Sequence, residues 1–117
     1  MKRGDIVLID FPFSTGHGSK RRPALIVQCD RNNLRLHDSI VAIITSNIVR
    51  AVHEPTQYLI EPSHADWAAS GLKLPSVVKC EHLYTFHNQR VLATIGQLSA
   101  ATMQKINECL KSSLELP

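Results

Sequence analysis

Asp5-Ile-Val-Leu-Ile-Asp-Phe11 is the stretch that decides the fold. Its branched and aromatic residues favour a β-strand, and Pro12 ends the run. Two further apolar runs follow, Ala24-Leu-Ile-Val-Gln28 and Ser39-Ile-Val-Ala-Ile-Ile-Thr45. Because their apolar character is continuous rather than alternating, we expect strands that are covered on both faces.

The second half of the chain supplies three more strand candidates and a terminal helix. The strands are expected at Gln57–Glu61, Ser76–Glu81 and Arg90–Ile95. After Ser99, which is placed to cap a helix, apolar residues recur at spacings of three and four up to Leu114. Six short strands and one long helix predict a single domain over residues 1–117. Its class is mainly β (α+β), a small bent sheet or barrel with a C-terminal α-helix packed on it.

The connections are expected to be polar loops. Residues 14–22 contain two glycines and the densest positive charge in the chain, which indicates a mobile loop. A polar turn is expected around Asn32 and Asn33, and a second long loop over residues 46–57. A short helix is predicted after Ser63, which would cap it, with Gly71 closing it.

Composition excludes several classes of protein. The 117 residues are 44% hydrophobic and 20% charged, as in one globular domain. The longest apolar stretch is the five residues Ile40–Ile44, whereas a bilayer needs about 20. Asp5 and Asp10 interrupt the sequence after the basic start, so no signal peptide is recognised. We therefore expect a cytoplasmic protein without a membrane partner.

Metal and cofactor chemistry lack their usual sequence patterns. Cys29, Cys80 and Cys109 are in no metal-ligand spacing, and we expect ordinary buried thiols. The histidines form no HExxH set and the acids no paired magnesium ligands, so no metal site and no cofactor are expected. The sequence also has no glycine-rich nucleotide-binding loop. Four histidines are expected at the surface: His37, His53, His64 and His87.

The positive charge is local. Residues 1–37 carry seven Lys and Arg against three Asp, whereas the remainder carries six against seven acids, for a total of +3. Such a bias is compatible with a polyanion partner, but taken alone it favours a solvated basic face.

Three polar segments could form a phosphate site: the loop Gly16-His-Gly18, the step Lys20-Arg-Arg-Pro23, and the strand end Thr45-Ser-Asn47. Pro23 biases Arg22 toward an extended conformation, so Arg22 should project from a defined strand start while Lys20 and Arg21 move in the loop. An arginine held in this way can bind two oxygens of one phosphate.

An ordered series of segments resembles the MazF/PemK/Kid toxins of bacterial toxin–antitoxin modules. The series runs through Arg3–Phe11, Arg22–Gln28, Ile44–Ser46, Leu74–Glu81 with Tyr84-Thr85, and Ile95–Ser99, before the closing helix. The resemblance implies an SH3-like curled barrel, a homodimer, and a metal-independent, usually sequence-specific endoribonuclease neutralised by an antitoxin.

The resemblance also implies site residues. It places the catalytic arginine of the family on Arg22, the catalytic threonine on Thr45 and a candidate active-site histidine on His17. One branch has Arg-Cys-Asp where this chain has Lys79-Cys-Glu81, which makes Glu81 a candidate catalytic residue. The candidate RNA-binding residues are Lys20, Arg21, Pro23, Ser46, Asn47 and Lys79.

Cleavage of single-stranded RNA without a metal would use the 2′-hydroxyl as nucleophile and leave a 2′,3′-cyclic phosphate and a 5′-hydroxyl. Arg22 is expected to neutralise the phosphorane and Thr45 to donate to a non-bridging oxygen, whereas His17 or Glu81 could move protons. Two alternatives stay open: a non-catalytic toxin that grips a protein, as gyrase poisons of similar architecture do, and a module that holds RNA without cutting it. The expected partner is a small acidic antitoxin whose disordered tail blocks the basic groove.

Overall fold

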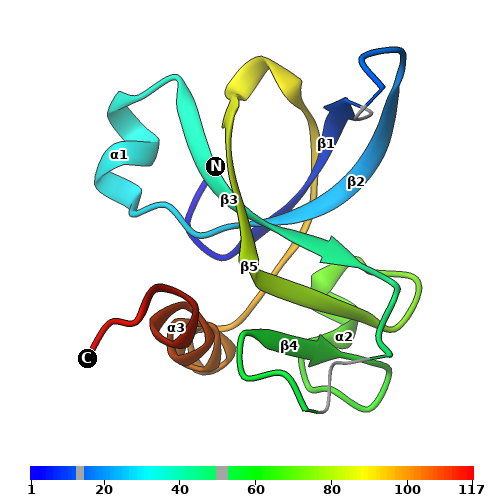
Figure 1. The fold of residues 1–117 in the computed structure, drawn as a ribbon, viewed down its shortest axis with the longest axis vertical. Helices are drawn as coiled ribbons and strands as arrows, with labels where there is room; N and C mark the ends of the chain where they lie inside the picture. Colours follow the sequence, from blue (N-terminus) through cyan, green and yellow to red (C-terminus); the bar gives the residue numbers. More distant parts are fainter. Residues whose placement is uncertain (13–14, 50–52) are drawn as a thin grey trace.

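The computed structural model describes residues 1–12, 15–49 and 53–117. The strands described there form one antiparallel sheet in the order β4-β5-β3-β2-β1-β6 (Figure 1). The predicted class, mainly β with a C-terminal helix, is confirmed. Because β4 and β6 are free edges, the sheet is curled but open and does not form a closed barrel. The elements are β1 (Asp5–Pro12), β2 (Ser19–Ile26), α1 (Asp30–Arg35), β3 (Asp38–Thr45), β4 (Gln57–Ile60), α2 (Trp67–Ser70), β5 (Ser76–His87), the 3-10 helix η1 (Asn88–Arg90), β6 (Val91–Gln97) and α3 (Ala100–Leu114).

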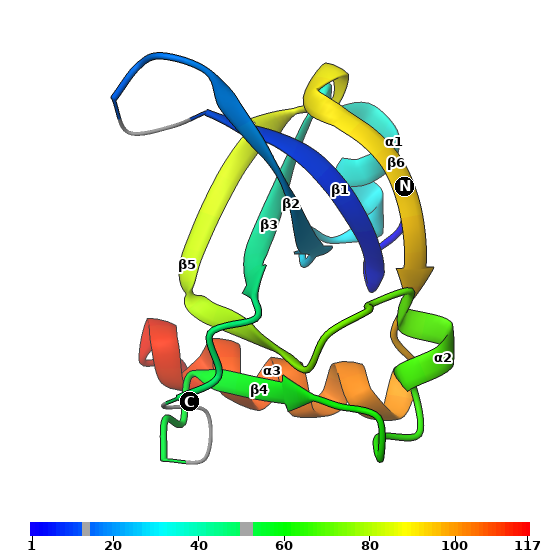
Figure 2. The same ribbon diagram turned by 90° about the vertical axis from the view of Figure 1, so that its right-hand side faces the viewer.

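A bend in β5 gives the sheet its shape. Ala42 of β3 pairs with Leu83, but the next residue, Ile43, pairs with Lys79, so residues 80–82 have no partner in this register. Extra residues on one strand make it bend and twist. Figure 2 shows the result: one half of β5 follows the curl of the sheet, and the other half turns away to lie with β4.

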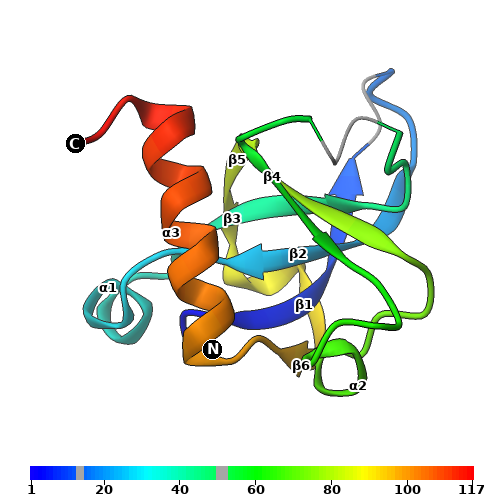
Figure 3. The same ribbon diagram turned by 90° about the horizontal axis from the view of Figure 1, so that it is seen from below.

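The two faces of the sheet bury two separate cores, because side chains alternate along each strand. The inner core lies within the curl and consists of Val7, Ile9, Ala24, Ile26, Val41, Ile43 and Phe86. The other face carries the helix-side core and is crossed by α3 (Figure 3). To this core α3 contributes Met103, Ile106 and Cys109. Phe11 of β1 contacts Phe86 of β5 although β2 and β3 separate these strands in the sheet, which demonstrates the curl.

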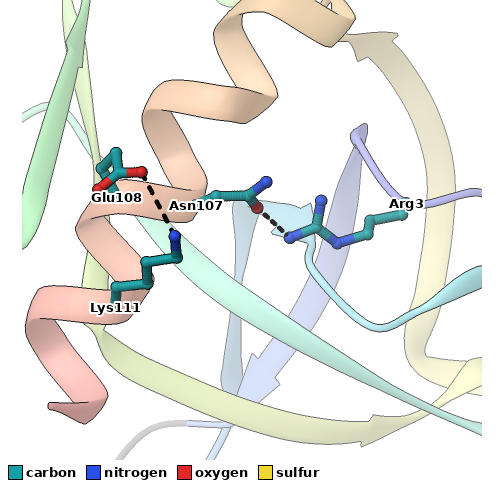
Figure 4. A network of polar contacts seen from close by, with 4 residues as sticks. All are labelled: Arg3, Asn107, Glu108 and Lys111. Atoms are coloured by element: carbon teal, nitrogen blue, oxygen red, sulfur yellow. Dashed lines mark hydrogen bonds and ion pairs between the residues drawn. The ribbon is translucent and has the colours of Figure 1, made fainter. Parts of the chain in front are cut away.

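Arg3 attaches the N-terminal segment to α3. Its Nη2 donates to Asn107 Oδ1 at 2.6 Å (Figure 4). Its Nε donates to the Val27 carbonyl at 2.9 Å. In the same view Lys111 forms an ion pair with Glu108, 3.6 Å apart, on the exposed side of the helix. The Arg3 guanidinium therefore links the N-terminal segment to both β2 and α3. None of the helices in the described ranges is long and apolar enough to cross a membrane.

The loop prediction for residues 14–22 was partly wrong. Ser14 lies outside the described residues, but β2 already begins at Ser19, and Lys20 and Arg21 pair with Phe11 and Asp10 of β1. The ladder with β1 holds this polar segment extended although its residues lack apolar character. The expected turn at residues 32–33 is the short helix α1, which buries none of its residues and so leaves no apolar pattern.

The predicted start of α3 and the predicted end of α2 are confirmed, but the predicted start of α2 was wrong. Ser99 caps α3 as expected, its Oγ accepting from the Thr102 amide at 3.3 Å. Helix α2 ends at Gly71 with φ of 71°, as expected, but it begins at Trp67, and Ser63 donates to Glu61 instead of capping it. Residues 50–52 of the expected loop 46–57 lie outside the described residues. Two predictions of burial were wrong. Cys29, expected to be buried, is exposed, and His64, expected at the surface, is half-buried.

Candidate active site

Strand register brings the two principal site candidates together. Ala24 of β2 pairs with Ile43 of β3 in an antiparallel ladder. Arg22 lies two residues before Ala24 and Thr45 two residues after Ile43, so both fall on the same face, just beyond the end of this ladder. This face is the one that carries the inner core. Arg22 and Thr45 therefore form its polar margin.

A cavity of about 240 Å³ opens at this margin. Four of its lining residues are cations, and none is an acid. We call this the basic cavity; its lining residues are Lys20, Arg21, Arg22, Pro23, Ile44, Thr45, Ser46, Leu72, Lys73, Leu74 and Ser76. Such a charge balance fits an anion, because a bound phosphate would find cations on several sides.

The Thr45 hydroxyl is oriented by the chain that follows it. Its Oγ1 accepts a hydrogen bond from the Asn47 backbone amide at 3.2 Å. A hydroxyl that accepts in this way still has its own proton to donate. Thr45 can therefore donate a hydrogen bond to an oxygen of a bound phosphate, the part that the sequence assigns to it.

The Arg22 guanidinium rests on an aromatic ring. Its Cζ lies 5.6 Å from the centroid of the Phe11 ring, a cation–π distance. Arg22 is half-buried, and in the described part of the chain the single ion pair is Lys111 with Glu108, so no carboxylate neutralises it. A positioned, uncompensated guanidinium is suited to binding a phosphate in bidentate fashion.

The fourth cation, Lys73, was missed by sequence analysis. It reaches the basic cavity because the turn before β5 is held rigidly: Ser70 Oγ accepts from the Leu72 amide at 3.1 Å, and Ser76 Oγ donates to the Leu74 carbonyl at 2.7 Å. A Cβ at Gly71 would collide with the Ile95 carbonyl, so this turn also lies directly against β6. The sequence signal was slight: two serines bracket Lys73, but their hydrogen bonds are visible only in three dimensions.

Four of the predicted site residues do not line the basic cavity. Lys79 pairs with Ile43 and Gln57 in the sheet. Glu81 lies in the bend of β5 and accepts from Gln57 Nε2 at 2.6 Å. His17 is exposed in the turn between β1 and β2, and Asn47 contributes its backbone amide to Thr45. Six predicted residues do line it, namely Lys20, Arg21, Arg22, Pro23, Thr45 and Ser46.

The surroundings of two titratable residues in β5, Glu81 and Cys80, determine their protonation states at neutral pH. Burial alone would raise the pKa of Glu81, but hydrogen bonds from Gln57, from the Glu81 backbone amide and from Thr56, together with the charge of Lys79, outweigh it and keep that pKa below its ordinary value. Glu81 is therefore a carboxylate at neutral pH. Burial raises the pKa of the Cys80 thiol to about 12, so it remains protonated and is a poor nucleophile.

Comparison with known proteins places this chain in a family. Residues 2–114 match the family described as PemK-like, MazF-like toxin of type II toxin–antitoxin system. The chain is 30% identical to endoribonuclease MazF9 of Mycobacterium tuberculosis, with 99% of this chain and 98% of the relative covered. It is 32% identical to endoribonuclease EndoA of Bacillus subtilis, with 99% and 96% covered.

Solved structures of related toxins have the same fold. A mycobacterial endoribonuclease in complex with its cognate antitoxin superimposes with a TM-score of 0.77 at 26% identity, covering 100% of this chain and 97% of the other. The fold is also that of MazF in a MazE–MazF complex from Deinococcus radiodurans, with a TM-score of 0.74 at 22% identity and coverage of 100% and 97%. The chain belongs to the PemK-like, MazF-like toxin family of type II toxin–antitoxin systems.

Proposed function

We propose that this toxin is a metal-independent, sequence-specific endoribonuclease that cleaves single-stranded RNA, including mRNA. The observation that carries the proposal is the basic cavity, which four cations and Thr45 line together, with no acid among its lining residues. Relatives that match along nearly their whole length are named endoribonucleases, which supports the same activity here. The proposed place of action is the cytoplasm, where mRNA is translated.

The proposed reaction uses the substrate's own nucleophile. The 2′-oxygen forms a bond to the adjacent phosphorus, and the bond from phosphorus to the 5′-oxygen breaks, which leaves a 2′,3′-cyclic phosphate and a 5′-hydroxyl. Negative charge on the non-bridging oxygens grows in the transition state. Arg22 would neutralise it through its guanidinium, and Thr45 would donate a hydrogen bond. DNA lacks the 2′-hydroxyl and would be spared.

Proton transfer is assigned to the two remaining candidates. Glu81, a carboxylate at neutral pH, could accept the proton of the 2′-hydroxyl, and His17 could donate to the leaving 5′-oxygen. Both would have to approach the basic cavity when RNA binds, because neither lines it in the free protein. Lys20, Arg21 and Lys79 would contact neighbouring phosphates of the strand.

We propose two partners, a second copy of the chain and an antitoxin, from the positive charge of the basic cavity and from the family of the chain. Two copies of the chain would form a homodimer whose paired basic margins make one longer RNA channel. An acidic antitoxin with a disordered tail would cover this channel, since the surface offers cations for its acids. Sedimentation at micromolar concentration tests the dimer; a fully active monomer would contradict it.

The activity is tested by incubating the purified protein with RNA in excess EDTA and identifying the new ends. The expected result is cleavage that EDTA does not stop, with 5′-hydroxyl ends that sequencing maps to a short common sequence. Arg22→Ala should not cleave, whereas the matched control Arg31→Ala, exposed on α1, should cleave normally. Absence of cleavage by the wild-type protein, or cleavage by Arg22→Ala, would contradict the proposal and favour the non-catalytic alternatives.

A further inference from the structure

Three of the chain's six aromatic residues, Phe11, Tyr84 and Phe86, form a cluster at one end of the inner core. The Phe11 ring lies 5.2 Å from the Tyr84 ring, edge to face at 83°, and 5.6 Å from the Phe86 ring. Phe86 is buried and closes the inner core. Tyr84, two residues earlier on the same face of β5, keeps 43% of its surface exposed. The cluster therefore ends in an aromatic side chain that faces solvent.

This cluster adjoins the basic cavity. Phe11 is the shared residue, because the Arg22 guanidinium lies over its ring at 5.6 Å, while Tyr84 packs against the same ring. The register of β1 and β2 also sets Lys20 directly opposite Phe11. Cations and aromatic rings are thus interleaved along one surface, from Lys20 and Arg22 to Tyr84.

A single-stranded RNA is the partner that this arrangement suits. Each nucleotide presents a phosphate, which binds cations, and a base, which stacks on an exposed aromatic ring without regard to its identity. The phosphate groups of one strand could occupy the basic cavity while an adjoining base reaches the aromatic cluster. Protein partners would find the same cations but would have no repeated planar group to place on Tyr84.

We infer that Tyr84, supported by Phe11, is a base-stacking residue that positions one nucleotide of the RNA next to the phosphate held at Arg22. The inference rests on the proposed function and adds to it a positioning residue that contacts the substrate. Because the stacked base does not change during the reaction, Tyr84 contributes to binding of substrate and transition state alike. Its loss should raise KM and leave kcat nearly unchanged.

The test compares two single-stranded probes that cannot be cleaved. One is a short 2′-O-methyl oligoribonucleotide of randomised sequence, and the other has the same backbone without bases. Fluorescence anisotropy gives Kd for the wild-type protein and for four variants: Tyr84→Ala, Tyr84→Leu, Tyr84→Phe and, as control, Leu92→Ala. Leu92 is a good control because it is similarly exposed, at 48%, on β6.

Stacking predicts a difference between the probes. Tyr84→Ala and Tyr84→Leu should weaken binding of the base-containing probe about tenfold and leave the abasic probe unchanged. Tyr84→Phe, which keeps the ring and loses only the hydroxyl, should bind like the wild-type protein, as should Leu92→Ala. Circular dichroism of each variant should match the wild-type spectrum.

Three results would overturn the inference: equal weakening on both probes, no weakening at all, or a changed sedimentation coefficient in Tyr84→Ala, which would make Tyr84 a contact between copies. Failure of the proposed function is read separately, from cleavage of unmodified RNA by the wild-type protein. Cleavage together with Tyr84 variants that do not discriminate between the probes would leave the nuclease intact and refute the stacking role.

Discussion

The backbone amide of Asn47 donates to the hydroxyl oxygen of Thr45 at 3.2 Å, across the end of β3. The contact occupies an acceptor position of the hydroxyl and leaves its proton for another partner. A side chain at the last position of a buried strand is thereby converted into a fixed hydrogen-bond donor at the edge of the basic cavity. The local turn therefore contributes to the site through its backbone.

Removal of the Thr45 hydroxyl alone should impair cleavage. Thr45→Val keeps the branched shape and is expected to lower kcat by about 10²–10³, the usual cost of one well-placed transition-state donor. Thr45→Ser retains a hydroxyl within reach of the Asn47 amide and should keep most of the activity. Single-turnover kinetics of the three proteins on one RNA measure the effect. Wild-type kcat in Thr45→Val would exclude this side chain from the chemistry.

Arg22 should be essential for cleavage and dispensable for folding. Arg22→Ala is expected to abolish cleavage and toxicity, and Arg22→Lys should restore only part of both, because an ammonium cannot bind two phosphate oxygens in the geometry of the guanidinium. Loss of the contact with the Phe11 ring should cost under about 1 kcal/mol of unfolding free energy. Urea denaturation checks the fold; an unfolded Arg22→Ala protein would make Arg22 a structural residue.

Lys73 should bind substrate through its charge only. Lys73→Ala is expected to raise KM, leave kcat unchanged, and reduce the slope of log KM against log salt concentration by about 0.7, as expected for one lost contact to a single-stranded phosphate. Lys105→Ala, exposed on α3 and absent from the cavity lining, is the matched control. The same salt slope in both variants would show that Lys73 does not contact RNA.

Asp66 should link stability to pH. Its Oδ2 accepts from the Ser99 amide at 2.8 Å and from the Ser99 hydroxyl at 2.9 Å, at the N-terminus of α3. Burial alone would raise the pKa of Asp66, but hydrogen bonds from Thr102 and Ser99 outweigh it and lower the pKa below its ordinary value. A carboxyl with a lowered folded pKa contributes stability that is complete above its unfolded pKa of about 4 and is lost as the pH falls through the folded value.

The measurement is urea unfolding of the wild-type protein and Asp66→Asn. Near neutral pH the variant should lose roughly 1 kcal/mol of unfolding free energy, since the charge at the helix N-terminus and part of its hydrogen bonding are gone. As the pH falls below the unfolded pKa of about 4 and through the lowered folded value, the difference in unfolding free energy should narrow. Asp38→Asn, at an exposed position of β3, controls for loss of a surface charge. A difference that stays constant with pH would contradict the role of the carboxylate.

Hydrophobic pattern was sufficient for the elements that bury a face. The run in β3 and the spacing in α3 predicted both correctly because their side chains fill the cores. α1 was missed because none of its residues is buried, and the start of β2 was missed because pairing with β1, not apolar character, holds Lys20 and Arg21 extended. Such ladder contacts leave no local signal in a polar segment.

The site was predictable to the extent that adjacent strands supply it. Thr45 ends β3, and Arg22 lies just beyond the part of β2 that pairs with β3, so their approach follows from the order and direction of these two strands. Lys73 comes from a turn whose position depends on Gly71 packing against β6, and Glu81 sits in a bend that the pattern of β5 did not reveal. Both facts depend on contacts between segments far apart in the sequence.

The order of the strands also dictates when the site can exist during synthesis. β1 and β6, from opposite ends of the chain, pair side by side, and the helix-side core needs Met103, Ile106 and Cys109 from α3. Contacts between such distant segments form only when the last of them is available. A ribosome-bound chain that still lacks α3 has every side chain of the basic cavity but no completed core to hold them in place. The fold that holds the basic cavity is therefore expected to be complete only after α3 has been synthesised.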